Sequence, residues 1–165
     1  MTEEYGFVQT HAHSPAANLP IDPVAVYDTL TRAGVAGLYP DFRGWFYGKV
    51  VPGLRKRERN IIPWMIDGQL AGIAICKRTP AEQKLCTLWV APEVRARGVA
   101  AKLANEAFTW IGTARPLFTV PEERSSEFAG LVETWSFPKA VAYDGLYRTG
   151  RVEFVFNGPL LQDAH

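Results

Sequence analysis

Apolar and polar positions alternate along the first third of the chain in patterns that predict a strand followed by two helices. Residues 5–12 predict a first strand, and a polar loop containing proline follows it. Asp22 and Pro23 predict the start of a helix, because aspartate caps free helix amides and proline suits the first helical position. The spacing of apolar residues then predicts helices over 23–33 and 41–49.

The middle of the chain changes to patterns typical of strands. Residues 60–66 and 69–77 are apolar runs joined by an Asp-Gly dipeptide, which is typical of a tight hairpin turn. Residues 85–90 predict a third strand, which the chain reaches through a polar turn. A mixed pattern follows: a helix over 100–111, a strand over 116–121, a helix over 122–135, and strands over 137–147 and 151–156.

The predicted hairpin also gives relative positions for the two cysteines. A hairpin centred near Ala81 would place Cys76 opposite Cys86, so that both side chains share one face of the sheet. We interpret them as two small buried thiols. A disulfide between them, or a reactive Cys86, is the alternative.

The order of elements is β-α-α-β-β-β-α-β-α-β-β. It predicts an α/β (α+β) fold with a mixed central sheet of about seven strands and about four helices. The chain of 165 residues has no internal repeat and no obvious linker, so we expect one domain over residues 1–165.

Composition narrows the class of protein. No apolar run is long enough to cross a bilayer, and the N-terminus lacks the pattern of a secretory signal. Two cysteines are too few for a disulfide scaffold, so we expect a cytoplasmic protein with reduced thiols. The net charge of +1 gives no general reason to expect binding to membranes or nucleic acid.

The stretch VAPEVRARGVA, residues 90–100, joins a predicted strand to a predicted helix. The first amides of a helix lack partners within the helix, and together with the helix dipole they attract phosphate. Gly98 allows a bulky anion to approach the backbone, while Arg95 and Arg97 add positive charge. The stretch therefore predicts a site for a phosphate or pyrophosphate group.

Val90, Pro92, Arg95, Gly98 and Ala100 form the pattern V-x-P-x-x-R-x-x-G-x-A. This pattern resembles the acetyl-CoA signature of the GNAT superfamily of N-acetyltransferases, and the predicted order of elements is similar to that fold. The resemblance implies an enzyme that uses acetyl-CoA as a co-substrate. In such an enzyme an amine attacks the thioester carbonyl directly, and the acceptor is a small amine or an amino group of a peptide or protein.

The resemblance also implies which residues bind the coenzyme. The backbone of Leu88, Trp89 and Val90 would pair with the pantetheine arm as an added strand would. Ser125 falls where the family usually has an asparagine, and we include it among the coenzyme-binding residues. The amides that would hold the pyrophosphate, beside the side chain of Arg95, are those of Arg97, Gly98, Val99, Ala100 and Ala101.

The chain departs from the family at the position of the usual general acid. Aligning Ser136-Phe137 with the family's Gly-Phe places Val132 where a tyrosine usually stands, and the strand before the signature has no carboxylate. The candidate catalytic residues are therefore Tyr147, Tyr143 and Glu122. Further candidates are Glu123, Thr119, His11 and His13. The spacing of the two histidines does not suggest a metal site, and we expect no bound metal.

Two other surfaces bear on the acceptor. One is a set of aromatic residues that either line the acceptor pocket or belong to the core. These residues are Tyr39, Phe42, Trp45, Phe46, Tyr47 and Trp89. The basic run from Lys49 to Arg59 is either a solvated helix end or a surface for an acidic partner. The alternatives are thus a catalytically silent acyl-CoA-binding module and an acyltransferase acting on tRNA or another nucleic acid. A homodimer is possible.

Overall fold

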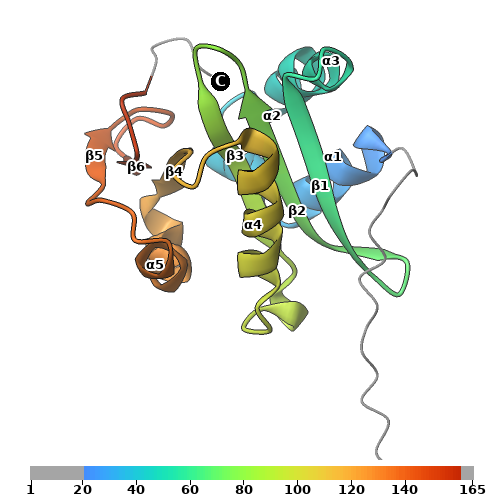
Figure 1. Cartoon of the computed structure of the whole chain (residues 1–165). Helices are drawn as coiled ribbons and strands as arrows, with labels where there is room; N and C mark the ends of the chain where they lie inside the picture. The colour runs from blue at the N-terminus through green and yellow to red at the C-terminus, as the bar shows by residue number, and fades with distance from the viewer. Residues whose placement is uncertain (1–20, 161–165) are drawn as a thin grey trace, which may run out of the picture.

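The computed structural model describes residues 21–160, which form a sheet flanked by helices on both faces (Figure 1). The strand order is β1-β2-β3-β4-β6-β5, with β3 parallel to β4 and all other neighbours antiparallel. The strand predicted over 5–12 lies outside the described residues. The six strands are β1 Arg59–Ile66, β2 Gln69–Arg78, β3 Gln83–Val90, β4 Leu117–Pro121, β5 Val141–Asp144 and β6 Val152–Phe156.

Four helical regions accompany the strands. In Figure 1, α4 lies in front of the central strands, whereas α1 and α2 lie behind them. The stretch from 42 to 55 is helical throughout, so the helix predicted over 41–49 is longer than expected. The helices are α1 Pro23–Arg32, α2 Phe42–Trp45, η2 Phe46–Val50, α3 Val51–Arg55, α4 Val99–Ile111 and α5 Ser125–Thr134, with 3-10 turns η1 Val35–Leu38, η3 Pro92–Val94 and η4 Glu122–Arg124.

The sequence explains why α4 packs closely on the sheet. One face of α4 is apolar and buried. The helix ends at Gly112, which has the left-handed conformation that glycine adopts readily. A Cβ on Gly72 of β2 would stand only 3.2 Å from Cδ2 of Leu103, so glycine is what allows α4 to lie this close. The buried residues of α4 are Val99, Leu103, Ala104, Ala107 and Ile111.

The predicted pairing of the two cysteines is wrong by one residue. Cys76 pairs with Leu85, and Ile75 pairs with Thr87, which leaves Cys86 as the extra residue of a β-bulge. Both thiols are free; Cys76 is fully buried and Cys86 is half-buried. Because a bulge interrupts the usual alternation of side chains, Cys86 and Thr87 both face the same cavity.

The strand predicted over 137–147 is much shorter than expected. Only Val141–Asp144 is a strand, and all four of its residues are exposed. Pro138 precedes it and cannot donate a ladder hydrogen bond, while Gly145 turns the chain with a φ of 72°. Tyr147 therefore lies in the loop between β5 and β6 rather than in a strand.

The parallel strands β3 and β4 stay together for a short distance only. Their paired residues are Lys84 with Leu117 and Leu85 with Phe118. From Cys86 onward the pairing stops, and the second half of β3 has an open edge on the side facing β4. We call this place the strand fork, and it positions the site described next.

Candidate active site

A cavity of about 350 Å³, here called the coenzyme cleft, lies where the end of β3 meets the start of α4 and the side of α5. It contains the backbone stretch that the sequence predicts as a phosphate site. The lining residues are Leu88, Val90, Val94, Arg95, Ala96, Gly98, Val99, Ala100, Ala101, Glu127, Phe128, Gly130 and Leu131.

The first turn of α4 is open to a ligand. Gly98 precedes the helix with a φ of 76°, and no side chain caps the helix amides. A Cβ at this position would meet nothing within 4 Å, and Gly98 lines the cleft. Val99 points into the core, whereas Ala100 and Ala101 are half-buried and line the cleft. The predicted arrangement of small residues around free amides is therefore present.

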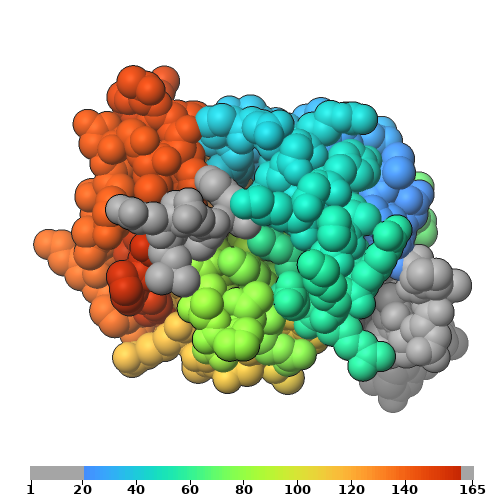
Figure 2. Space-filling view, turned by 90° about the horizontal axis from the view of Figure 1, so that it is seen from above, coloured from blue at the N-terminus to red at the C-terminus, as the bar shows by residue number. Residues whose placement is uncertain are grey.

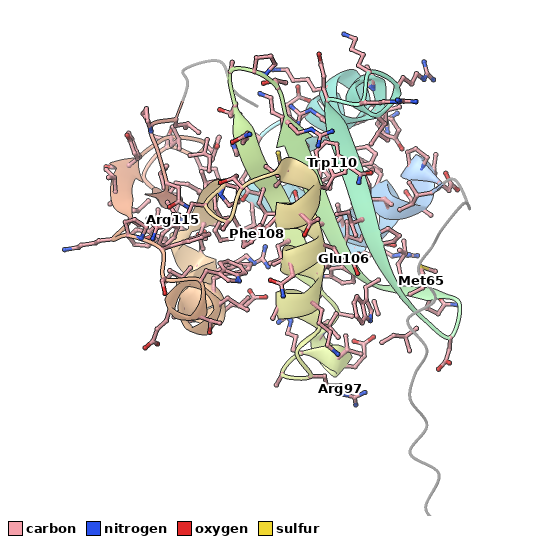
Figure 3. The ribbon with its side chains drawn as sticks, viewed as in Figure 1. Met65, Arg97, Glu106, Phe108, Trp110 and Arg115 are labelled. Atoms are coloured by element: carbon pink, nitrogen blue, oxygen red, sulfur yellow. The ribbon has the colours of Figure 1, made fainter. Side chains whose placement is uncertain are left out.

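The two arginines of the signature take different positions. Nε of Arg95 donates to the carbonyl of Val90 at 3.1 Å, and its guanidinium lies 3.6 Å from Glu127. Arg97 is exposed and points away from the body of the protein at the start of α4 (Figure 3). Arg95 thus contacts the strand edge rather than the helix amides.

Arg124 makes a matching contact from the other side of the fork. Its Nη2 donates to the carbonyl of Leu88 at 3.4 Å, and its Nε donates to Glu127 at 3.0 Å. Burial opposes ionisation of Glu127, but the hydrogen bond from Arg124 and the charges of both arginines hold its pKa below the usual range. We call Arg95, Glu127 and Arg124 the arginine bridge.

The arginine bridge shows which strand groups face the open edge. The carbonyls of Leu88 and Val90 point toward it, since both accept bonds from this bridge. Trp89 pairs with Ile73 of β2, so its backbone points the other way, and its side chain is buried. Of the three residues predicted to pair with the pantetheine arm, Leu88 and Val90 therefore offer backbone groups at the open edge.

A second cavity, of about 270 Å³, lies on the face to which the bulge turns its side chains, and we call it the aromatic pocket. Figure 2 looks onto this end of the molecule, where the segment of η1 and α2 adjoins the β5–β6 loop. The rings of Tyr39 and Tyr147 meet edge to face at 5.5 Å across that boundary. The lining residues are Tyr39, Pro40, Asp41, Phe42, Gly44, Trp45, Lys49, Lys84, Cys86, Thr87, Thr119 and Tyr147.

A small hollow of about 10 Å³ lies at the strand fork between the two cavities. Thr87 and Thr119 line both this hollow and the aromatic pocket, while Leu88 and Phe128 line both the hollow and the coenzyme cleft. The hollow thus has Thr87 and Thr119 on the side of the aromatic pocket and Leu88 and Phe128 on the side of the coenzyme cleft.

Glu153 of β6 is the residue that sequence reasoning missed. It is 3% exposed, and its carboxyl accepts a hydrogen bond from the Thr119 side chain. Within residues 21–160 its Oε1 has no hydrogen-bond partner. Burial raises its pKa to about 7, against the Thr119 bond and the charges of Arg148 and Lys84. The available signal was a lone carboxylate in the apolar strand VEFVF.

The three predicted catalytic residues lie in different places. Tyr147 lines the aromatic pocket, and its hydroxyl accepts a hydrogen bond from Nζ of Lys84 at 3.3 Å. Tyr143 is 38% exposed on β5, opposite Glu153. Glu122 accepts from the amide of Val152 at 3.3 Å and lines neither cavity.

The structure also places the two positions at which the chain departs from the family pattern. The hydroxyl of Ser125 donates to the carbonyl of Glu122 at 2.9 Å, and this exposed residue does not line the coenzyme cleft. Val132, where the family usually has a tyrosine, is half-buried against the core.

Glu123 holds the loop that carries Tyr147. Its two carboxylate oxygens accept bonds from the Arg148 guanidinium at 2.6 and 2.8 Å. These hydrogen bonds lower the pKa of Glu123 to about 2. The pair therefore ties the β5–β6 loop to η4.

Other predicted residues divide between the pocket and the core. Tyr39, Phe42 and Trp45 line the aromatic pocket, but Phe46 and Trp89 are core residues. The basic run also divides: Lys49 lines the aromatic pocket, Arg59 is buried with Nη1 3.6 Å from Sγ of Cys86, and Arg55, Lys56 and Arg57 are exposed. His11 and His13 lie outside the described residues.

Comparison with known proteins assigns the class. The sequence profile of the acetyltransferase (GNAT) family matches residues 25–142. The chain therefore belongs to the GNAT acetyltransferase family, in agreement with the predicted resemblance. No curated protein sequence matches the chain.

Solved structures show the same fold. A GNAT-family acetyltransferase of Desulfovibrio desulfuricans is 19% identical with a TM-score of 0.66, covering 84% of this chain and 92% of that one. Ard1 of Thermoplasma volcanium is 10% identical with a TM-score of 0.66, covering 84% and 93%. The PaiA N-acetyltransferase of Thermoplasma acidophilum, solved with coenzyme A, is 15% identical with a TM-score of 0.55, covering 81% and 91%.

Two features are absent from residues 21–160. None of the helices between residues 21 and 160 is long and apolar enough to cross a membrane. The same residues contain no group of three or more histidine, cysteine, aspartate or glutamate side chains that could hold a metal ion.

Proposed function

We propose that this protein transfers the acetyl group of acetyl-CoA to an amine that enters the aromatic pocket. The observation that carries the proposal is the strand fork, where the coenzyme cleft and the aromatic pocket border the same small hollow. This geometry brings two molecules together end to end, as direct transfer between them requires.

The coenzyme cleft suits acetyl-CoA in shape and polarity. The free amides from Arg97 to Ala101 would bind the pyrophosphate at the start of α4, with Gly98 leaving room for it. The pantetheine arm would pair with the open edge of β3 at Leu88 and Val90, replacing the arginine bridge. The Leu88 amide faces the same edge as its carbonyl and would polarise the thioester oxygen.

Glu153 and Thr119 supply a route for the proton that the acceptor must lose. An ammonium group at Thr119 passes a proton to the threonine hydroxyl, and that hydroxyl passes its own proton to the Glu153 carboxylate. The neutral amine attacks the carbonyl carbon, and the carbon–sulfur bond breaks. Tyr147 would protonate the departing thiolate, because its hydroxyl accepts from Lys84 and so does not use its own proton in that bond.

Two experiments test this function. Release of free thiol from acetyl-CoA, measured over a broad panel of amines, should depend on one class of amine. Thr119→Val removes the hydroxyl and should abolish most turnover without weakening acetyl-CoA binding, whereas Thr119→Ser should retain it. Tight acetyl-CoA binding without release for any acceptor would instead indicate a silent binding module. Equal activity of the two variants would exclude the proton route.

A further inference from the structure

The aromatic pocket contains a buried positive charge that forms no ion pair with a carboxylate of residues 21–160. Lys84 is 5% exposed, and in the described structure the only hydrogen bond of its ammonium is to the Tyr147 hydroxyl at 3.3 Å. No carboxylate lies within ion-pair distance of it among residues 21–160. A buried ammonium is costly unless an anion compensates it.

The rest of the pocket does not balance this charge. Lys49 adds a second cation to the lining, and Nη1 of the buried Arg59 lies 3.6 Å from Sγ of Cys86, which also lines the pocket. Among the described residues, Asp41 is the only carboxylate in the lining, and it accepts a hydrogen bond from the Gly44 amide at 3.2 Å as a helix cap. An acceptor that brought only an ammonium group would add a further positive charge.

Burial by itself favours the neutral form of Lys84. Interactions with Cys86, Tyr147 and Glu82 nevertheless raise its pKa above the ordinary value, so the side chain is charged at neutral pH. The cation is therefore a permanent feature of the pocket.

The remaining walls and the size of the pocket describe the body of the acceptor. Phe42, Trp45 and Tyr39 present aromatic surface, and the cavity of about 270 Å³ suits a small molecule. A macromolecule could insert only a terminal group into this space.

We propose that the acceptor is a small amino acid-like molecule, with an amine, an apolar body and a carboxylate that binds the Lys84 ammonium. In this pose the amine lies at Thr119 and the apolar body lies against Phe42 and Trp45. The inference rests on the proposed acetyltransferase function and specifies its substrate class.

The first test uses the unaltered protein and compares matched acceptors. Each apolar or aromatic L-amino acid is assayed with acetyl-CoA beside its methyl ester and its decarboxylated amine, which keep the amine but lack the negative charge. The free acid should have a kcat/KM at least about tenfold higher than either analogue, as expected for a hydrogen-bonded charge pair. Equal or better activity of the uncharged analogues would overturn the proposal and favour a peptide or an aminoacyl ester.

The second test changes the lysine. Lys84→Met removes the charge while retaining the apolar stem, and Lys56→Met is the matched control at an exposed position. Lys84→Met should raise the KM for the acid and erase the preference over the ester, whereas the control should change neither. A fall in kcat/KM of the same size for acid and ester, which leaves the preference for the acid intact, would overturn the proposal.

These outcomes separate this inference from the proposed function. Acetylation of amines that lack a carboxylate with a kcat/KM equal to or above that of the acids would refute the substrate class and leave the acetyltransferase intact. Absence of acetyl transfer to every amine and amino acid, despite a folded protein that binds acetyl-CoA, would refute both.

Discussion

Replacing Glu153 by glutamine should stabilise the protein at alkaline pH and leave its stability in mild acid nearly unchanged. The folded protein holds the proton of this buried carboxyl more tightly than the unfolded chain, because the pKa is about 7 rather than 4.5. At 1.36 kcal/mol for each pH unit, keeping the carboxylate ionised in the folded state costs about 3 kcal/mol.

The sign of the effect follows from proton linkage. Between the two pKa values the folded state binds more protons than the unfolded state, so wild-type stability falls as the pH rises from 4.5 through about 7. Glutamine cannot ionise, so the variant should not lose this stability as the pH rises. Its amide oxygen can still accept the hydrogen bond from Thr119.

Urea denaturation of both proteins, at about pH 5 and about pH 8, measures the effect. Subtracting the free energy of unfolding of the wild type from that of the variant at each pH cancels the contributions of titratable groups that both proteins share. The difference should grow by about 2.5 kcal/mol between the two conditions in favour of the variant. An equal difference at both pH values would refute the assignment of a buried, ionising Glu153.

The same variant tests the proton route through kinetics. In the wild type kcat/KM should rise with pH and level off above about 7. The Glu153→Gln variant should show no such rise, and its kcat/KM should be about a hundredfold lower than that of the wild type. A structural role alone would lower the rate without removing this rise, so a retained rise would contradict the route.

Three further predictions concern the cleft and the loop. Gly98→Glu should abolish acetyl-CoA binding by calorimetry in a folded protein, since it places bulk and negative charge in the open space at the helix start; unchanged affinity would refute the phosphate site. Tyr147→Phe should lower kcat about tenfold and Tyr143→Phe, at an exposed position, should not; equal effects would exclude Tyr147 as the acid. Glu123→Gln should raise the KM for the acceptor by releasing Arg148 and the loop, and an unchanged KM would show that this pair does not position Tyr147.

Much of the fold followed from local signals in the sequence. Asp22 caps α1 with its side chain on the Val24 amide, as the Asp-Pro pair predicted, and Gly112 ends α4. The proposed phosphate site also depends on neighbouring residues only, because Gly98 and the first amides of α4 are adjacent in the chain. Periodicity and capping report such features well.

The errors arose where distant residues decide the structure. The bulge at Cys86 shifts the register by one residue, and nothing in the local pattern of β3 marks it. Glu153 escaped notice because its importance depends on Thr119, which reaches it only through the pairing of β4 with β6. The burial of Lys84 was not predictable from the sequence either, since a lysine near the start of a strand is ordinarily solvated.

The arginine bridge has a consequence for the behaviour of the protein without ligand. Two strands that part inside a sheet expose carbonyls that could recruit a strand from another molecule. Here the carbonyls of Leu88 and Val90 are already occupied by charged side chains, and guanidinium groups at a strand edge disfavour pairing between copies. The fork can therefore stay open for a ligand without presenting an edge that seeds aggregation.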